Sequence, residues 1–483
     1  MEAELNSNIV IDRRPLWIVL LDRMRRELIL ALIFVIFFFL LGRDLPDNIS
    51  GEGYKTLCLF FLCVSLWATN LIPLSITSLL AIAGIPLLGI MSSTEAYSFF
   101  GNKAIFFILG VFIISASMTG SGLTSRISIW IFETWGKTPK KLVGGVYFFG
   151  LMGSCFMSEH AVAAMLFPIL LQIIQTLDLN PSQKSPFAKS LIFSMAWGCI
   201  IGGAATVLGG GRVPLAVEIL EQATDGARTI GILEYSKLSF PLVAILAICG
   251  WVVLNIMFPP GEGNIESARK ALRQKLSEMG MVSPREKGVG LVMAATLFGW
   301  FFYGEVLGIA NVAILSITVL FLFNLINWKM VEDHVNWAVI IMYGGAICLG
   351  EAMVRTGAAL WLAEQAFDSQ TQSPLFFLAS IAILSMVFTT FMSNSAVIAI
   401  LIPPTLGIAP SYGIDLVLAT MTVILPSNFA FMLPIATPAS ALAYSSKLIQ
   451  LKDMIRSGIV LGILGILSYL FLYLFYWPML GFQ

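Results

Sequence analysis

Long apolar runs separated by short polar stretches follow one another along almost the whole chain. A helix needs about 20 mainly apolar residues to cross the hydrocarbon core of a bilayer, and several of the runs reach or exceed that length. The pattern therefore predicts an all-α polytopic membrane protein. The runs lie at 28–42, 54–72, 74–90, 104–119, 143–177, 188–220, 237–257, 288–306, 309–327, 336–353, 374–409, 414–447 and 455–479.

Four of these runs are too long for one uninterrupted helix. The runs 143–177 and 374–409 carry polar residues near their midpoints, and we predict that each folds as a re-entrant helical hairpin that enters and leaves the membrane by the same face. The runs 188–220 and 414–447 contain the interruptions "TVLGGGRVP" and "LPIATPASA". Because glycine and proline weaken a continuous helix, these two are predicted to be helices broken near the middle.

The order of these elements occurs twice. Residues 1–27 are interpreted as a cytoplasmic segment, and 28–257 as a first span followed by scaffold helices, a hairpin, a broken helix and a last helix. A cytoplasmic linker at 258–287 precedes a second unit at 288–483 with the same order. About eleven transmembrane helices result, and an odd number of crossings inverts the second unit relative to the first. Inverted repeats with paired broken helices are typical of secondary transporters.

Positively charged residues predict the orientation, because cytoplasmic loops are enriched in Lys and Arg. Three clusters fall on one side if the first hairpin does not cross the membrane. That side is assigned to the cytoplasm of a protein in the plasma membrane, with the N-terminus inside and the C-terminus outside. The clusters are Arg13, Arg14, Arg23, Arg25 and Arg26; Arg126, Lys137, Lys140, Lys141, Lys184 and Lys189; and Arg269, Lys270, Arg273, Lys275, Arg285 and Lys287.

The amino-acid composition limits the classes of function that the protein can have. The chain is 58% hydrophobic and only 12% charged, with 28 basic and 28 acidic residues, so the lipid bilayer is its expected environment and nucleic acid is not an expected partner. The six cysteines all lie in apolar segments and are interpreted as packing residues. No metal-ligand spacing, nucleophile–base pair or complete phosphate-binding loop is present. We therefore expect no enzyme activity and no cofactor.

The two predicted hairpin tips carry related motifs. "TTFMSNSAVIAILIPP" aligns with "SCFMSEHAVAAMLFPI", so that Asn394 matches Glu159 and Ser395 matches His160. Hydroxyl and amide side chains at a tip offer uncharged donors and oxygens, and helix ends that meet there leave N–H groups for an anion and C=O groups for a hard cation. The duplication of the motif favours a binding site over simple packing.

Three stretches of the second unit identify a family. "MSNSA" at 392–396, "LPIATPASALAYSS" at 433–446 and "YGGAICLGEAMVRTGAALWLAEQ" at 343–365 resemble the divalent anion/sodium symporters of di- and tricarboxylates and sulfate. The resemblance implies a homodimer in which each protomer has a scaffold domain and a transport domain that moves like an elevator. It also implies one sodium in each half and an anionic substrate between the tips.

When the functional residues of the family are matched to this sequence one by one, the second half agrees well with the family motif. It implies a sodium site made by Thr389, Ser393, Asn394 and the Ala436 carbonyl, and it places Ser393, Asn394, Ser395, Thr437 and Pro438 against the substrate. The first half departs from the family. Only Ser158 of its tip motif remains, Glu159 and His160 replace Asn and Thr, and Gly210-Gly211 followed by Arg212 replaces Thr-Pro. The substrate-contacting set of the first half is therefore Ser158, Glu159, His160 and Arg212.

Glu159 and Arg212 fall in elements that face each other in the resembled fold, so we expect them to pair, with Arg212 close to where a first sodium would lie. Their role stays open between a purely structural pair, an anion contact by Arg212, and a coupling proton carried by Glu159 or His160. The leading hypothesis is a secondary active transporter of a dicarboxylate- or sulfate-class anion, coupled to sodium at one site. Alternatives are a proton-coupled transporter or exchanger that uses Glu159 and His160, and an uncoupled anion channel or transporter-like sensor.

Overall fold

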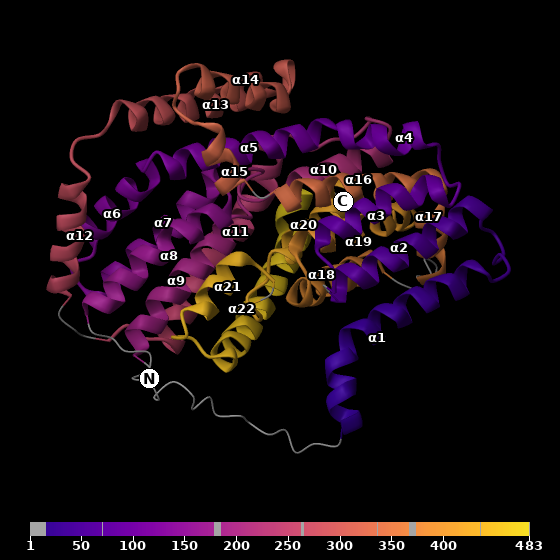
Figure 1. Cartoon of the computed structure of the whole chain (residues 1–483), viewed down its shortest axis with the longest axis horizontal. Coiled ribbons are helices and arrows are strands. Elements are labelled where there is room, and N and C mark those ends of the chain that lie inside the picture. The colour runs from indigo at the N-terminus through magenta and orange to yellow at the C-terminus, as the bar shows by residue number, and fades with distance from the viewer. Residues whose placement is uncertain are drawn as a thin grey trace, which may run out of the picture.

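The computed structural model describes residues 16–69, 71–177, 185–261, 265–335, 337–366, 373–434 and 436–482. These residues are folded into helices joined by short connections, without a β-strand (Figure 1). Seven described helical segments are long and apolar enough to cross a membrane: Ser93–Gly120, Glu159–Thr176, Ile232–Met257, Trp337–Arg355, Pro374–Phe391, Asn394–Tyr412 and Leu451–Met479. The predicted all-α polytopic membrane fold is confirmed, while the count of eleven crossings and their sidedness stay predictions.

The first unit contains eleven α-helices among its described residues. The hairpin consists of α7 and α8, and the broken helix of α9 and α10. The helices are α1 (Leu16–Leu41), α2 (Gly51–Thr69), α3 (Leu74–Leu87), α4 (Ser93–Ser98), α5 (Lys103–Gly120), α6 (Leu123–Trp135), α7 (Pro139–Phe156), α8 (Glu159–Thr176), α9 (Pro186–Gly202), α10 (Arg212–Ala223) and α11 (Ile232–Met257).

The linker and the second unit contain the remaining described helices. Here α18 and α19 form the hairpin, and α20 and α21 the broken helix. The helices are α12 (Glu266–Glu278), α13 (Pro284–Leu307), α14 (Ile309–Leu322), α15 (Trp328–His334), α16 (Trp337–Arg355), α17 (Ala358–Ala366), α18 (Pro374–Phe391), α19 (Asn394–Ile408), α20 (Leu416–Ser427), α21 (Pro438–Ser445), α22 (Leu451–Phe471) and α23 (Trp477–Met479).

Both predicted hairpins begin and turn in the same way. Thr138 and Ser373 cap α7 and α18 by accepting hydrogen bonds from backbone N–H groups of the first turn, and a proline follows each cap. That arrangement starts a helix efficiently, because the proline lacks only an N–H that would be unpaired anyway. Each hairpin then turns through two non-helical residues, 157–158 and 392–393. The helical hairpins and the breaks at 203–211 and 428–437 agree with the predictions from the sequence.

The predicted linker at 258–287 is more structured than a polar loop. It contains the charged helix α12, and α13 already begins at Pro284. Arg273 of α12 donates to Glu133 of α6 at 2.6 Å, and Arg126 of α6 donates to Glu286 at 2.7 Å. These ion pairs join α12 and the start of α13 to α6.

Close backbone packing holds the hairpins against the broken helices. A Cβ at Gly202 of α9 would lie 2.1 Å from the Leu151 carbonyl oxygen of α7, so only glycine permits this approach. A similar contact joins α3 to α16, where a Cβ at Gly345 would lie 2.6 Å from the Ser78 Cα. Small residues that let helices approach closely are the usual means of association in membranes. The contact at Gly202 holds the first hairpin against the first broken helix.

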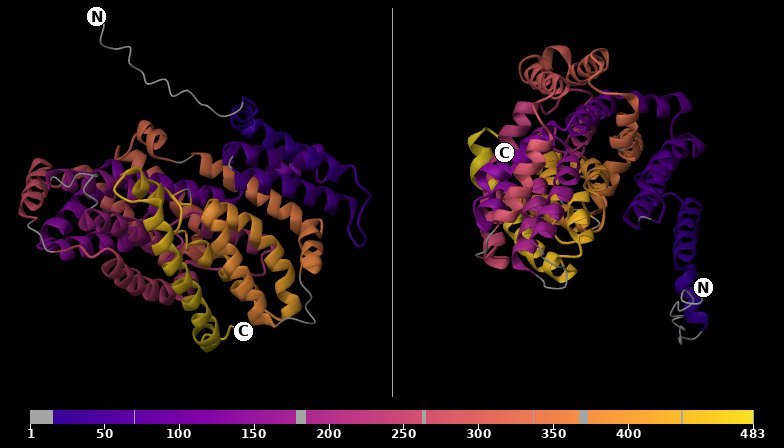
Figure 2. Two further views of the ribbon diagram at one scale, coloured as in Figure 1. Left: turned by 90° about the horizontal axis from the view of Figure 1, so that it is seen from below. Right: turned by 60° about the vertical axis from the view of Figure 1, so that its left-hand side comes forward.

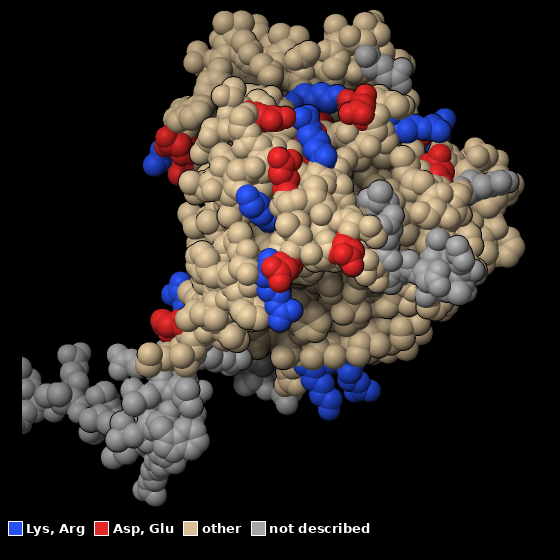
Figure 3. All heavy atoms as spheres, turned by 90° about the vertical axis from the view of Figure 1, so that its right-hand side faces the viewer, with Lys and Arg blue, Asp and Glu red and all other residues tan. Residues whose placement is uncertain are grey.

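The periphery of the molecule is mainly apolar. In Figures 1 and 2, α1 lies at one edge and the α13–α14 pair at another. Charged residues are scattered as isolated groups over the face shown in Figure 3. Such a surface suits contact with lipid. Exposed apolar side chains on α1, α13 and α14 include Leu32, Val35, Phe38, Leu291, Phe302, Val306, Leu315 and Leu322.

Candidate functional site

Four helices begin at one cavity of about 570 Å³. Their first residues are Glu159 of α8, Arg212 of α10, Asn394 of α19 and Pro438 of α21, and all four line the cavity. Each helix N-terminus carries about half a positive charge and free N–H groups. The two hairpin tips and the two breaks therefore create a region of positive potential that favours an anion.

The second-half side of the cavity is uncharged and rich in oxygen atoms. Ser393 caps α19 by accepting from the Ala396 N–H, and Thr437 caps α21 by accepting from the Ser440 N–H. Behind the tip, the Thr389 hydroxyl donates to Asn394 Oδ1 at 2.7 Å. The side chains in this region are held by local hydrogen bonds, so their oxygens are preorganised.

The predicted sodium ligands of the second half lie within this region. Ser393, Asn394 and Ala436 line the cavity, whereas Thr389 is fully buried and touches Asn394 from behind. Hydroxyl, amide and backbone carbonyl oxygens are the donors that a hard cation prefers. The set fits sodium chemically, and the site would place the ion beside the region where the anion is favoured.

The first-half side of the cavity is charged. Arg212 Nη1 lies 3.3 Å from Glu159 Oε2, and both side chains are buried, with 3% and 0% exposure. The Glu159 backbone N–H also donates to the Gly209 carbonyl at 2.9 Å, which ties the hairpin tip to the break of α9 and α10. The predicted contact between Glu159 and Arg212 is thus present.

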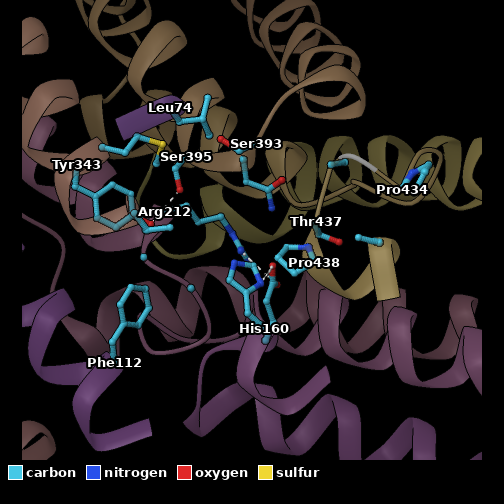
Figure 4. A pocket seen from close by; sticks show the side chains of 18 of the residues that line it. Leu74, Phe112, His160, Arg212, Tyr343, Ser393, Ser395, Pro434, Thr437 and Pro438 are labelled. Carbon is cyan, nitrogen blue, oxygen red and sulfur yellow. Dashed lines mark hydrogen bonds and ion pairs between the residues drawn. The ribbon is translucent and has the colours of Figure 1, made fainter. Parts of the chain in front are cut away.

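His160 lies beside this pair. Its Nδ1 is 3.7 Å from Glu159 Oε1, and its side chain is 37% exposed to the cavity. Figure 4 shows its ring next to the end of the Arg212 side chain, facing Pro438 of the opposite break. The ring is therefore placed to touch a cavity occupant as well as Glu159.

Several polar atoms of the charged side lack hydrogen-bond partners among the described residues. They are Glu159 Oε1 and Oε2, His160 Nδ1, and Arg212 Nε and Nη2. An unpaired buried polar group is costly, and more so when it is charged. These atoms are buried within the wall, so their unpaired state does not by itself give an occupant of the cavity a donor or acceptor.

One wall of the cavity was not predicted from the sequence. Tyr343 of α16 lies 3.0 Å from the Ser395 hydroxyl, and a Cβ at Gly211 would lie 2.1 Å from the Tyr343 hydroxyl. Phe112 of α5 and Leu74 of α3 also line the cavity. Tyr343 is in the "YGGAICLG" stretch, but nothing in that stretch indicates which helix face meets the tips.

Most of the predicted site residues come together here. Ser158 is the exception among the proposed substrate contacts, because it is buried behind the first tip and does not line the cavity. The predicted residues that line it are Glu159, His160, Arg212, Ser393, Asn394, Ser395, Ala436, Thr437 and Pro438.

Comparisons with known proteins agree with a transporter fold. A family model described as the sodium:sulfate symporter transmembrane region matches residues 22–483. SdcS, a sodium-dependent dicarboxylate transporter of Staphylococcus saprophyticus, is 27% identical over 464 residues, which cover 90% of this chain and 88% of the relative. SdcS of Staphylococcus aureus is 26% identical over 439 residues, which cover 86% of this chain and 84% of the relative.

Two solved transporter structures share the fold. MtrF of Neisseria gonorrhoeae aligns with a TM-score of 0.57 and covers 94% of each chain. The YdaH transporter of Alcanivorax borkumensis aligns with a TM-score of 0.50 and covers 95% of this chain and 98% of that one. Both are 14% identical to this chain, so this likeness concerns the fold alone.

Proposed function

The chain belongs to the sodium:sulfate symporter family, and from this premise we propose that it carries a small anion across the membrane together with sodium. The observation that carries the proposal is the convergence of four helix N-termini on one cavity, beside a cluster of neutral oxygen ligands. The first feature favours an anion and the second favours a hard cation. The names of the relatives, sodium-dependent dicarboxylate transporters, support the same combination of substrates.

We propose that sodium binds in the second half alone, at Thr389, Ser393, Asn394 and Ala436. In the first half, the Arg212 guanidinium lies where the corresponding cation would be expected, and a second cation beside it would be repelled. The anion lies between the tips, against Arg212 on one side and Ser395 and Thr437 on the other. Dicarboxylates and sulfate are the substrate class that the family suggests.

An elevator-type motion is the proposed mechanism. The hairpin tips and the breaks of the broken helices form one wall of the cavity. The other wall is formed by Leu74 of α3, Phe112 of α5 and Tyr343 of α16. A site between two groups of helices opens to either face when one group slides against the other. We propose that the hairpins and broken helices form the moving group, and that the protein is a homodimer as the family resemblance implies.

A second candidate is coupling to protons instead of sodium. It is favoured by one observation, namely that the His160 ring faces the cavity at 3.7 Å from Glu159 Oε1. A histidine near a carboxylate is a common proton carrier. Under this alternative a pH gradient drives uptake without sodium, and His160→Gln abolishes it.

Uptake into proteoliposomes tests the proposal. An inward sodium gradient should drive accumulation of a radiolabelled anion above its equilibrium level, and an equal potassium gradient should not. An uncoupled channel gives equilibration without accumulation. Accumulation that follows a pH gradient in sodium-free buffer would show that the coupling ion is the proton and not sodium.

A further inference from the structure

We propose that Glu218 of α10 and Asn102, which directly precedes α5, form a latch that closes the cavity on the α10 side and breaks in each transport cycle. The proposal rests on the elevator-type motion of the proposed function, in which α10 moves and α5 does not. It assigns a positioning role to two residues that do not line the cavity. Its basis is the unequal burial of the second halves of the two broken helices.

These second halves, α10 and α21, differ in exposure at matching positions. When Gly211 is aligned with Pro438, Glu218 of α10 matches Ser445 of α21. Ser445 is exposed and lines the cavity together with Tyr444, whereas Glu218 is only 6% exposed. The structure describes α10 in full, and only its first residue lines the cavity. The cavity therefore extends along α21 and stops at the N-terminus of α10.

The two helices also differ in what packs against them. On one side, α10 packs against α5 and α16, which contribute to the wall that is proposed not to move. On the other side, α21 packs against α8 and α9, and Val339 and Met342 of α16 line the cavity together with Tyr444 of α21. The cavity is thus closed along α10 and open along α21. By the sidedness predicted from the sequence, the α21 side faces the cytoplasm.

Two polar contacts join α10 to the start of α5 on the closed side. Asn102 Nδ2 donates to Glu218 Oε1 at 2.5 Å, and Lys103 forms an ion pair with Glu221. The Lys103 side chain is 62% exposed, and an exposed ion pair contributes little. Glu218 is buried, so its carboxylate needs donors. Gln222 of α10 donates to it at 3.3 Å, and Asn102 supplies a donor from outside α10.

Sliding of α10 past α5 breaks the bond between Asn102 and Glu218. A hydrogen bond to a charged group is stronger than one between neutral groups, and the bond exists only while the two helices lie together. Opening along α10 exposes the Glu218 carboxylate to water, which replaces the lost donor. The latch therefore favours the state that is closed along α10, without contact with the anion or the cation in the cavity.

The reactivity of introduced cysteines in the full-length protein in detergent tests the latch. Val217→Cys reports on the α10 side, because Val217 is the half-buried counterpart of Tyr444, and Ser445→Cys reports on the α21 side. We expect Ser445→Cys to react faster with a charged maleimide. Added Asn102→Ala should raise the rate of Val217→Cys by up to about tenfold, because it removes a bond to a charged group. The rate of Ser445→Cys should not rise, and it should fall as the other state gains population.

Variants of Glu218 decide the same question if Asn102→Ala does not fold. Glu218→Gln keeps an oxygen that accepts from Asn102, whereas Glu218→Ala keeps none, so the rate of Val217→Cys should rise more in Glu218→Ala. Asn311→Ala is the matched control, at an exposed asparagine of α14 whose amide donates to the Leu307 carbonyl, and it should leave both rates unchanged. Equal rates in the two Glu218 variants would show that the bond to Asn102 does not hold the closed state.

Uptake measured in parallel separates this proposal from the proposed function. The probes are radiolabelled succinate and sulfate, supplied to proteoliposomes with an inward sodium gradient. Sodium-driven uptake by the unmodified protein, with unchanged labelling in Asn102→Ala, leaves the function intact and shows the latch to be wrong. A rise of both labelling rates also contradicts the latch, because general loss of stability exposes both positions. The expected labelling changes without sodium-driven uptake contradict the proposed function alone.

Discussion

At the scale of single residues, the two hairpin tips differ in charge at matching positions. Asn394 offers a neutral amide oxygen at the cavity wall, whereas Glu159 at the matching position is held by Arg212 at 3.3 Å. A carboxylate already paired with a guanidinium is a poor ligand for a further cation, because the added positive charge is repelled. Two predictions, one about sodium binding and one about stability, test this difference between the tips.

The first prediction concerns sodium. Asn394→Ala removes one proposed oxygen ligand and should raise the sodium concentration for half-maximal uptake about tenfold, because a contact to a charged partner contributes about 1.5–3 kcal/mol and 1.4 kcal/mol is a factor of ten. Ser158→Ala is the control, since Ser158 does not line the cavity and its side chain makes no capping hydrogen bond with α8. Equal sensitivity of both positions would show that the tips have not diverged in cation binding.

The second prediction concerns the stability of the buried pair. Removing one partner of a buried ion pair typically costs about 3–5 kcal/mol, whereas replacing both charges can be nearly neutral. Glu159→Gln and Arg212→Met should each lower the folded yield and the melting temperature in detergent, and the double variant should recover much of the loss. Strictly additive losses would mean that the two side chains do not stabilise each other.

Transport by the same double variant separates the roles of the pair. A purely structural pair leaves the double variant active once it is folded. If Arg212 also holds the anion, the double variant folds but its KM for the anion rises. Sodium-dependent uptake, normalised to folded protein, distinguishes these two results.

At the scale of elements, the position of each tip depends on how closely its hairpin packs against the broken helix. The backbones of α7 and α9 approach at Gly202, where a Cβ would lie 2.1 Å from the Leu151 carbonyl oxygen, 2.8 Å from its carbonyl carbon and 2.8 Å from its Cα. Backbone atoms cannot move aside as the end of a flexible side chain does. The contact therefore sets the distance between the first tip and the first break.

Gly202→Ala should consequently separate α7 from α9. Overpacking of a well-packed interior costs about 1–3 kcal/mol, and we expect a lower melting temperature together with weaker anion binding, because Glu159 and Arg212 lie at the ends of the displaced elements. Gly51→Ala is the matched control, since a Cβ at Gly51 meets nothing within 4 Å. A Gly202→Ala protein with unchanged stability and affinity would show that the contact is not needed for the site.

At the scale of the whole molecule, the predicted sidedness can be tested by labelling. Lys140 and Ser411 are exposed, and five of the six native cysteines are buried, with Cys249 partly buried, so the native background should be low. Cysteines introduced at Lys140 and Arg273 should react with a membrane-impermeant maleimide only from the cytoplasmic side, and one at Ser411 only from outside. Reaction of positions 140 and 411 from the same side would contradict the inverted arrangement of the two hairpins.

Local sequence patterns predicted the features that depend on neighbouring residues. Apolar runs of excessive length with polar centres located both hairpins, and Gly- and Pro-rich interruptions located both breaks, because hydropathy and helix propensity act over a few neighbouring residues. The resemblance to the symporter family, in which the two elements face each other, also predicted the contact between Glu159 and Arg212. That succeeded because an ionisable residue in a membrane segment needs a partner, and few were available.

The set of groups that share the cavity depends on tertiary packing and could not be predicted from local pattern. Packing turned Tyr343 toward Ser395, placed Ser158 and Thr389 behind the tips, and buried two N–H groups of Arg212 that have no hydrogen-bond partner among the residues that the structure describes. It also placed α12, from a segment that has no apolar run, against α6, where Arg273 pairs with Glu133. Each of these depends on side-chain directions and on contacts between residues far apart in the chain, and the direction of a side chain is fixed by the helix against which it packs.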